Sequence, residues 1–164
     1  MTSKVVVTLP FEPMPSPRPR VRVIGKFAQV YMEKAYVDLK AQIAEFVKGT
    51  VERVGDDQFH APVTILVESV ATPPKTTKLS APKGDVDNFA KTVLDALTTS
   101  EVVWKDDTQV QSLTTTKRWA EKGEPAHTQV TITYGPTGLA LLIATLCAAS
   151  KATLAEVQKL WKAN

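Results

Sequence analysis

The sequence KGDVDNFAKTVLDALTTSEVVWKDDTQVQSLTTTK, residues 83–117, decides the fold that we predict for this chain. After Asp87, apolar residues recur at helical spacing, which predicts a helix over residues 86–98. Alternating residues follow from about Gln109 and predict a strand. A helix joined to a strand by a short turn indicates a domain that combines both kinds of element.

Four aspartates stand where this helix and this strand begin: Asp85, Asp87, Asp106 and Asp107. A helix start and a strand start can converge in space, and three or four carboxylates would then meet at one point. Carboxylates gathered in this way repel each other unless a hard cation lies between them. The stretch therefore predicts a Mg²⁺ site.

Each of these residues also has an ordinary structural explanation. Asp85 stands at a helix N-cap position, and Asp87 lies in the first turn, where a negative charge suits the helix dipole. Lys91 is four residues from both Asp87 and Asp95, so ion pairs along one helix face would explain it. The second acidic pair alone could be a turn. These explanations do not account for two acidic clusters at element ends with a lysine one turn inside the helix.

Other kinds of site fit the sequence poorly. An EF-hand is excluded because Phe89 occupies a ligand position and no glutamate closes the loop. A zinc site is disfavoured because His60, His127 and Cys147 lack ligand spacing. The sequence contains neither a Walker glycine loop nor a recognisable Ser/His/Asp arrangement.

The composition is that of an ordinary globular protein. The chain has 164 residues, a net charge of +3 and a pI near 9.0, which permits a polyanionic partner without requiring one. The single cysteine fits a reducing cytosol, and the N-terminus lacks the apolar core of a signal peptide. The apolar run at residues 139–149 is too short to span a bilayer. We therefore expect a cytoplasmic protein with no membrane partner.

The remaining periodic segments predict an α+β fold, in which a small mixed or antiparallel sheet has helices packed on it. Further strands are expected at residues 4–9, 62–71 and 127–134, and a further helix at residues 33–47. The strands at residues 109–119 and 127–134, joined by EKGEP, should form an antiparallel hairpin. The helix at residues 33–47 should end near Gly49. Its inward residues should be Ala35, Leu39, Ile43 and Phe46.

The composition changes after residue 135. Residues 1–135 are predicted to form one domain, and residues 136–164 are a C-terminal extension with the pattern of a helical hairpin. Its first helix is apolar all round and should therefore be buried, against the domain or against a partner subunit.

The proline-rich segment PFEPMPSPRPRVRV places arginines at the alternate positions 18, 20 and 22. Proline favours an extended backbone, in which alternate side chains share a face. The segment is either a solvated loop or an arm that contacts phosphate through its arginines.

The pattern K-G-D-V-D-N-F-x-K-x-x-L-D-A-L, followed by W-K-D-D-T-Q-V and K-R-W, closely resembles the RusA family of endodeoxyribonucleases, the phage- and prophage-borne Holliday junction resolvases. P-S-P-R-P-R resembles the family's Pro/Arg segment, and the resemblance covers about residues 4–134. The chain departs from the family pattern at Gly84, where the family has proline, and in the tail after Tyr134.

The resemblance implies a Mg²⁺-dependent nuclease, with Mn²⁺ able to substitute, that resolves four-way DNA junctions. It implies a homodimer with two sites related by a two-fold axis, which nicks two strands in a pair. The metal-binding, catalytic aspartates fall on Asp85, Asp87 and Asp107, with Asp106 as an assisting neighbour. The essential lysine falls on Lys91.

In such a nuclease, cations near the acidic site would offset its repulsion of DNA. The expected DNA contacts are Arg18, Arg20, Lys75, Lys78 and Lys83. The setting implied by the resemblance is a bacterial cell or a phage-infected host. Two alternatives remain open: a metal-dependent nuclease that acts on other branched DNA, and a non-catalytic DNA-binding module whose aspartates only cap helices.

Overall fold

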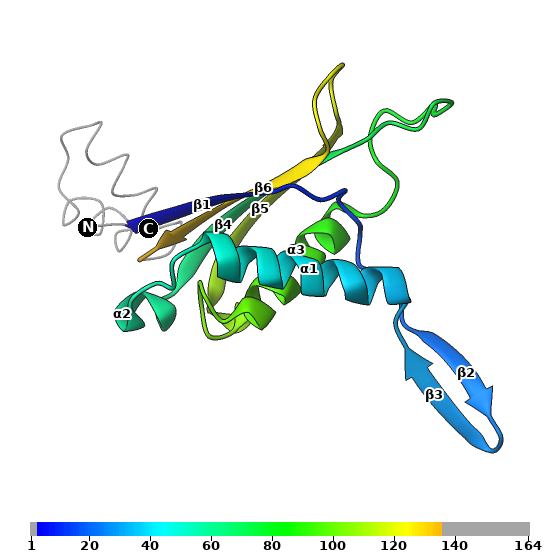
Figure 1. The fold of residues 1–164 in the computed structure, drawn as a ribbon, viewed down its shortest axis with the longest axis horizontal. Coiled ribbons are helices and arrows are strands. Elements are labelled where there is room, and N and C mark those ends of the chain that lie inside the picture. Colours follow the sequence, from blue (N-terminus) through cyan, green and yellow to red (C-terminus); the bar gives the residue numbers. More distant parts are fainter. Residues whose placement is uncertain (1–2, 136–164) are drawn as a thin grey trace, which may run out of the picture.

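The computed structural model describes residues 3–135 of the chain and has an α+β fold (Figure 1). Its strands are β1 (Ser3–Leu9), β2 (Arg20–Ile24), β3 (Phe27–Tyr31), β4 (Val63–Ala71), β5 (Val110–Trp119) and β6 (His127–Tyr134). Its helices are α1 (Lys34–Thr50), α2 (Asp56–Phe59) and α3 (Val86–Ser100), with a 3₁₀ turn, η1, at Asp107–Gln109. The helical hairpin predicted for residues 136–164 lies outside the described residues.

Four strands form one mixed sheet in the order β1-β6-β4-β5. The predicted hairpin between β5 and β6 is wrong, because β4 lies between them, parallel to β5 and antiparallel to β6. Parallel neighbours need a crossover connection, and α3 supplies it between β4 and β5. β4 takes a central place because its residues are buried along their whole inner face, whereas β5 alternates half-buried and exposed residues, as an edge strand does.

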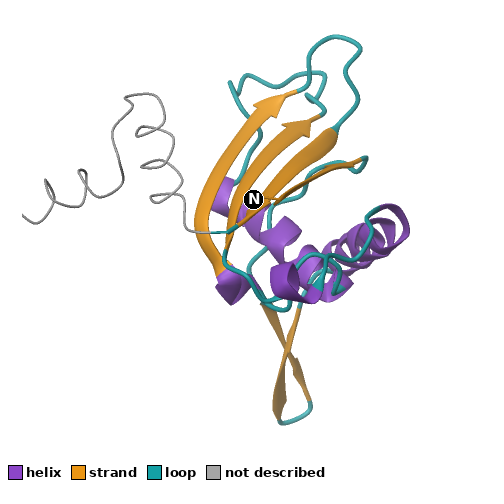
Figure 2. Cartoon of the chain, turned by 90° about the vertical axis from the view of Figure 1, so that its left-hand side faces the viewer, coloured by secondary structure: helices purple, strands orange, loops and turns teal. Residues whose placement is uncertain are grey.

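Helices α1 and α3 lie side by side and cover one face of this sheet (Figures 1 and 2). The core between them and the sheet includes the fully buried Ile65, Leu97 and Trp104. Two hydrogen bonds satisfy the polar atoms of large core side chains: Trp104 Nε1 donates to Thr98 Oγ1 at 2.8 Å, and the Tyr134 hydroxyl donates to the Val103 carbonyl at 2.8 Å. Within residues 3–135, no helix is both long and apolar enough to cross a membrane.

Helix α1 differs from its prediction at both ends. It continues through Gly49 to Thr50, and its buried stripe includes Tyr36 where Ala35 was expected. Ala35 is exposed. Tyr36 turns inward because its hydroxyl reaches α3, where it donates to Asp95 Oδ2 at 3.2 Å. The expected inward positions of Ile43 and Phe46 are confirmed, the first as buried and the second as half-buried.

The proline-rich segment leads into a β-hairpin that the sequence reading did not predict. β2 pairs with β3 in antiparallel register, and Gly25 turns the chain with a φ of 63°. The alternation of Arg20 and Arg22 on one face is confirmed, since both lie in β2. The hairpin projects from the domain, and every residue from Arg20 to Tyr31 is exposed (Figures 1 and 2).

Candidate active site

The start of α3 presents three of the predicted site residues together. Asp85 occupies the N-cap position with extended backbone, Asp87 lies in the first turn, and Lys91 follows one turn later. All three are exposed. The helix begins here because the Asn88 amide donates to the Asp85 carbonyl at 3.1 Å, which closes the first turn. The positive end of the helix dipole at this point favours carboxylates and phosphate alike.

Asp87 lies in the first turn as the helix dipole favours, but the cap and the ion pairs expected for Asp85 and Lys91 are not formed. The Asp85 carboxylate makes no capping hydrogen bond. The Lys91 ammonium group forms no ion pair or hydrogen bond with any side chain between residues 3 and 135. Asp95, its expected partner, instead accepts from Tyr36 and from Lys40 Nζ at 3.3 Å. The charged groups at the start of α3 are therefore free to bind something other than the protein.

Lys117, near the end of β5, holds the loop that delivers Asp85. Its ammonium group donates to the Pro82 carbonyl at 2.8 Å and to the Gly84 carbonyl, and it lies 5.7 Å from the centre of the Phe89 ring. The sequence reading assigned no role to Lys117. The alternation of residues along β5 is the sequence feature that could have revealed it. Lys117 stands in register with the buried Ser69 of β4, so its side chain lies on the helix-covered face of the sheet.

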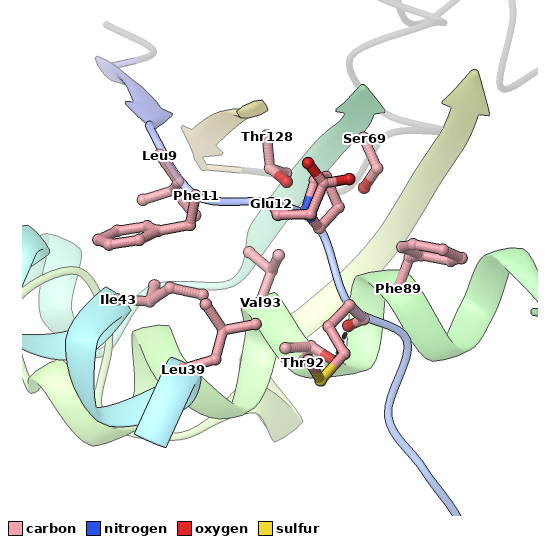
Figure 3. Close-up of a pocket in the computed structure, with 12 residues that line it drawn as sticks. Leu9, Phe11, Glu12, Leu39, Ile43, Ser69, Phe89, Thr92, Val93 and Thr128 are labelled. Atoms are coloured by element: carbon pink, nitrogen blue, oxygen red, sulfur yellow. Dashed lines mark hydrogen bonds between the residues drawn. The ribbon is translucent and has the colours of Figure 1, made fainter. Parts of the chain in front are cut away.

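The proline-rich segment packs across the same start of α3. The Ser16 amide donates to the Asn88 carbonyl at 2.9 Å, and Thr92 Oγ1 donates to the Met14 carbonyl at 2.8 Å (Figure 3). Gly84 has a φ of 108°, and a Cβ there would lie 2.9 Å from Pro15 Cγ. Proline could not adopt that φ, so the departure of this chain from the family pattern at position 84 fits its own backbone.

The pocket in Figure 3 lies beneath the proline-rich segment, between β1, α1 and α3. Its walls are mainly apolar, with Leu9, Phe11, Leu39 and Val93 among them. None of the predicted catalytic or metal-binding residues lines it. The pocket is therefore separate from the predicted catalytic and metal-binding residues.

The second acidic pair lies where the chain leaves α3 and enters β5. Asp106 caps η1: its Oδ1 accepts from the Thr108 amide at 2.9 Å, and the Gln109 side chain closes the capping box. Hydrogen bonding to Thr108 lowers the pKa of Asp106 below its ordinary value. Asp107 is exposed, and its carboxylate has no partner among residues 3–135. The cap explains Asp106 structurally, whereas nothing in the fold explains Asp107.

The two acidic pairs do not converge within one chain. They flank the 15-residue helix α3, which at 1.5 Å per residue is about 22 Å long. The segment that carries Asp106 and Asp107 is also held at the far end of the molecule, because Gln109 Nε2 donates to the Phe59 and Ala61 carbonyls at 3.0 and 2.7 Å (Figure 1). Within the described residues, no group of three or more His, Cys, Asp or Glu side chains is placed to hold a metal ion.

The predicted DNA contacts lie at the end of the molecule where α3 starts. Three of them, Lys75, Lys78 and Lys83, are exposed on the loop from β4 to α3 (Figure 1). This loop is attached to β5 by a hydrogen bond of 2.9 Å that Trp119 Nε1 donates to the Leu79 carbonyl. The other two predicted contacts belong to the proline-rich segment and the hairpin. Arg18 is exposed, and Arg20 forms an ion pair with Glu33 at the root of the hairpin.

A comparison with protein-family models identifies the family of this chain. The family model described as Endodeoxyribonuclease RusA matches residues 10–133, which include both acidic pairs, Lys91 and the proline-rich segment. No curated protein was found to match the sequence. Because the family model spans most of the chain, the protein belongs to the RusA family of endodeoxyribonucleases.

Proposed function

We propose that this endodeoxyribonuclease resolves four-way DNA junctions by paired nicks, with Mg²⁺ as its cofactor. Membership of the RusA family supports action on Holliday junctions. The observation that carries the proposal further is the start of α3, where Asp85, Asp87 and Lys91 are exposed and unused by the fold. Carboxylates without protein partners are suitable ligands for a hard cation, which prefers a few carboxylate oxygens together with water and phosphate oxygens.

When bound, the metal ion would activate water and neutralise charge on the scissile phosphate. The residues of the chain have separate tasks in this proposal. Asp85 and Asp87 would hold the ion through their carboxylates. Lys91 stabilises the charge that develops on the phosphate as the bond breaks. Lys117 fixes the loop that precedes Asp85, so that both carboxylates keep one geometry.

We propose that the site is completed by a second copy of the chain. Asp107 belongs to the ligand set implied by the family pattern, yet the length of α3 separates it from Asp85 and Asp87 of its own chain. β5 is an edge of the sheet, with Asp107 just before its first residue and Lys117 near its last. If two β5 edges pair antiparallel about a two-fold axis, the start of each strand faces the end of the other. That geometry would carry Asp107 of one subunit toward Asp85 of its partner.

Two heterodimers test this arrangement. In the first, an Asp87→Asn subunit is paired with an Asp107→Asn subunit, each with its own affinity tag, and the heterodimer is isolated by tandem purification. If the site is shared between subunits, this heterodimer keeps one intact site and should nick a synthetic four-way junction at about half the wild-type rate, without paired cuts. If each chain builds its own site, both sites are damaged and the junction stays intact.

The reciprocal heterodimer is the matched control. A wild-type subunit paired with an Asp87→Asn/Asp107→Asn subunit should be inactive when the site is shared, but active when each chain builds its own. Wild-type protein with and without Mg²⁺ gives the reference rates. Parallel reactions on a three-way junction, a fork and a duplex distinguish a resolvase of four-way junctions from a nuclease that acts on other branched DNA. Binding without cleavage of any of these would support a non-catalytic module.

A further inference from the structure

The β2–β3 hairpin has two chemically different faces and a distinct tip. In the antiparallel register, Val21 lies opposite Val30 and Val23 lies opposite Ala28, so one face is wholly apolar. The other face carries the pairs Arg20–Tyr31 and Arg22–Gln29. At the tip, Ile24 lies opposite Phe27 across the Gly25–Lys26 turn. The hairpin is therefore a ribbon with a basic face, an apolar face and an apolar end.

Nothing in the described part of the chain covers this ribbon. Val23 is 72% exposed and Phe27 is 80% exposed, although both are large apolar side chains. An isolated two-stranded hairpin is only marginally stable in water, and its folded form needs a partner that covers at least one face. An exposed apolar surface of this kind marks an interaction site.

The charge of the ribbon favours a polyanion as that partner. Residues 18–31 contain four basic residues, Arg18, Arg20, Arg22 and Lys26, and no acidic residue. Arg22 is held in place on the ribbon, because its Nε donates to Gln29 Oε1 at 2.8 Å and its guanidinium lies 5.4 Å from the centre of the Tyr31 ring. A guanidinium positioned in this way is suited to phosphate.

We propose that the β2–β3 ribbon enters a groove of the DNA next to the branch point of a junction, and that Phe27 and Ile24 wedge against the unstacked base pair there. This proposal rests on the proposed function. The major groove of B-DNA is wide enough for a two-stranded ribbon, and proteins commonly kink DNA with apolar wedges. At a branch point the stack is already interrupted, so the wedge meets an open base face at little further cost.

The attachment of the ribbon to the domain links this DNA contact to the position of cleavage. The proline-rich segment is bound to α3 through Ser16 and Thr92, directly beside Asp87 and Lys91. The intervening prolines stiffen the short connection from Ser16 to Arg20. A tip fixed at the branch point would therefore set the distance from the branch to the phosphate that is cut.

The test compares Phe27→Ala with wild-type full-length protein in EDTA, where the DNA is bound but not cut. Phe27→Ala should weaken binding to a four-way junction by about tenfold or more, as loss of an aromatic–base stack does, and should leave duplex binding unchanged. The fluorescence of a 2-aminopurine placed at the branch point should increase when wild-type protein unstacks it, and should not increase with Phe27→Ala. Lys26→Gln should lower the slope of log Kobs against log salt by about one.

Val6→Thr is the matched control, since Val6 is also an exposed apolar residue, 51% exposed, and lies on β1 away from the hairpin. It should bind the junction as wild type does. Equal junction affinity and equal 2-aminopurine signal for wild type and Phe27→Ala would overturn the proposal. If sedimentation shows that wild type is a dimer and Phe27→Ala a monomer, the ribbon binds a second copy of the chain and not DNA, and the proposal is overturned. Wild-type protein that neither binds nor cuts junctions would instead reject the proposed function itself.

Discussion

The ammonium group of Lys117 donates a hydrogen bond of 2.8 Å to the backbone carbonyl of Pro82. This contact joins the end of β5 to the loop that enters α3, across a separation of 35 positions in the sequence. The same ammonium group also bonds the Gly84 carbonyl. The backbone that delivers Asp85 is thus fixed by a side chain from a distant strand.

Replacement of Lys117 by Met should loosen this loop without removing any proposed metal ligand. We expect the cleavage rate at saturating Mg²⁺ to fall less than the apparent Mg²⁺ affinity, because the ligands remain but are less well oriented. A titration of the junction-cleavage rate with Mg²⁺ measures both. Lys122→Met, at an exposed position in the β5–β6 connection, is the control. An unchanged Mg²⁺ midpoint would show that Lys117 has no positioning role.

Variants of Lys91 and Lys40 should distinguish a lysine needed for catalysis from one needed for stability. Lys91→Ala should lower the rate of junction cleavage by about a hundredfold, as expected for a group that stabilises phosphate charge, with an unchanged melting temperature. Lys40→Ala removes the half-buried ion pair with Asp95 and should lower the free energy of unfolding by less than about 1 kcal/mol, with activity retained. Single-turnover cleavage and thermal melts of both variants check this. Normal cleavage by Lys91→Ala would exclude it from the site.

Asp106 and Asp107 are neighbours with different expected roles. Asp107→Asn should abolish cleavage and leave the melting temperature unchanged, because its carboxylate has no partner in the described structure. Asp106→Ala should lower the melting temperature by removing the η1 cap, and Asp106→Asn should largely restore it, since the amide oxygen can still accept from Thr108. If Asp106→Asn is as inactive as Asp107→Asn, both carboxylates belong to the metal site.

The Asp106 cap also predicts a dependence on pH. Its folded-state pKa is lowered from the ordinary value of 3.8 by the hydrogen bond from Thr108. The cap therefore contributes its full stability above the ordinary pKa, and this contribution is lost as the pH falls below it. The melting temperatures of wild type and Asp106→Ala, compared between pH 6 and pH 3, should converge toward the acidic end, since alanine does not titrate.

Tyr134 should be needed for the core. Its buried hydroxyl donates to the Val103 carbonyl at 2.8 Å, so Tyr134→Phe leaves a buried carbonyl without that donor and should cost about 1–2 kcal/mol in the free energy of unfolding. Burial also raises the pKa of Tyr134 above its ordinary value of 10.0, so the protein should lose stability as the pH rises past 10. Urea unfolding measures the first effect, and Tyr31→Phe, on the exposed hairpin, is the control that should change nothing.

The sequence was sufficient for features that depend on neighbours along the chain. The spacing of apolar residues located α3, and the helix start placed Asp85, Asp87 and Lys91 within about two turns of each other. The alternation of β4 located its strand and its buried face in the same way. These features are local because helix and strand periods fix where side chains point a few residues away.

Strand order was not available from the sequence. β5 and β6 are close in the chain and have the pattern of a hairpin, but β4 is inserted between them. Sequential strands usually pair, and that tendency favoured the hairpin. It failed because β4 has more buried residues than β5 or β6 and is best placed with a strand on each side. Lys117 was missed for the same reason, since its partners in the loop at residues 82–84 meet it only when β5 lies beside β4.

The sequence alone thus determined which carboxylates and which lysine are candidates for chemistry, and the tertiary structure decided which of them meet. A helix start and a strand start can adjoin or lie a full helix length apart, and the residues themselves are compatible with both. Here α3 crosses from the end of β4 to the start of β5, and in a parallel pair these two points lie at opposite ends of the strands. Asp85 and Asp107 therefore lie beyond opposite ends of α3, a helix about 22 Å long, because the two strands that α3 connects are parallel.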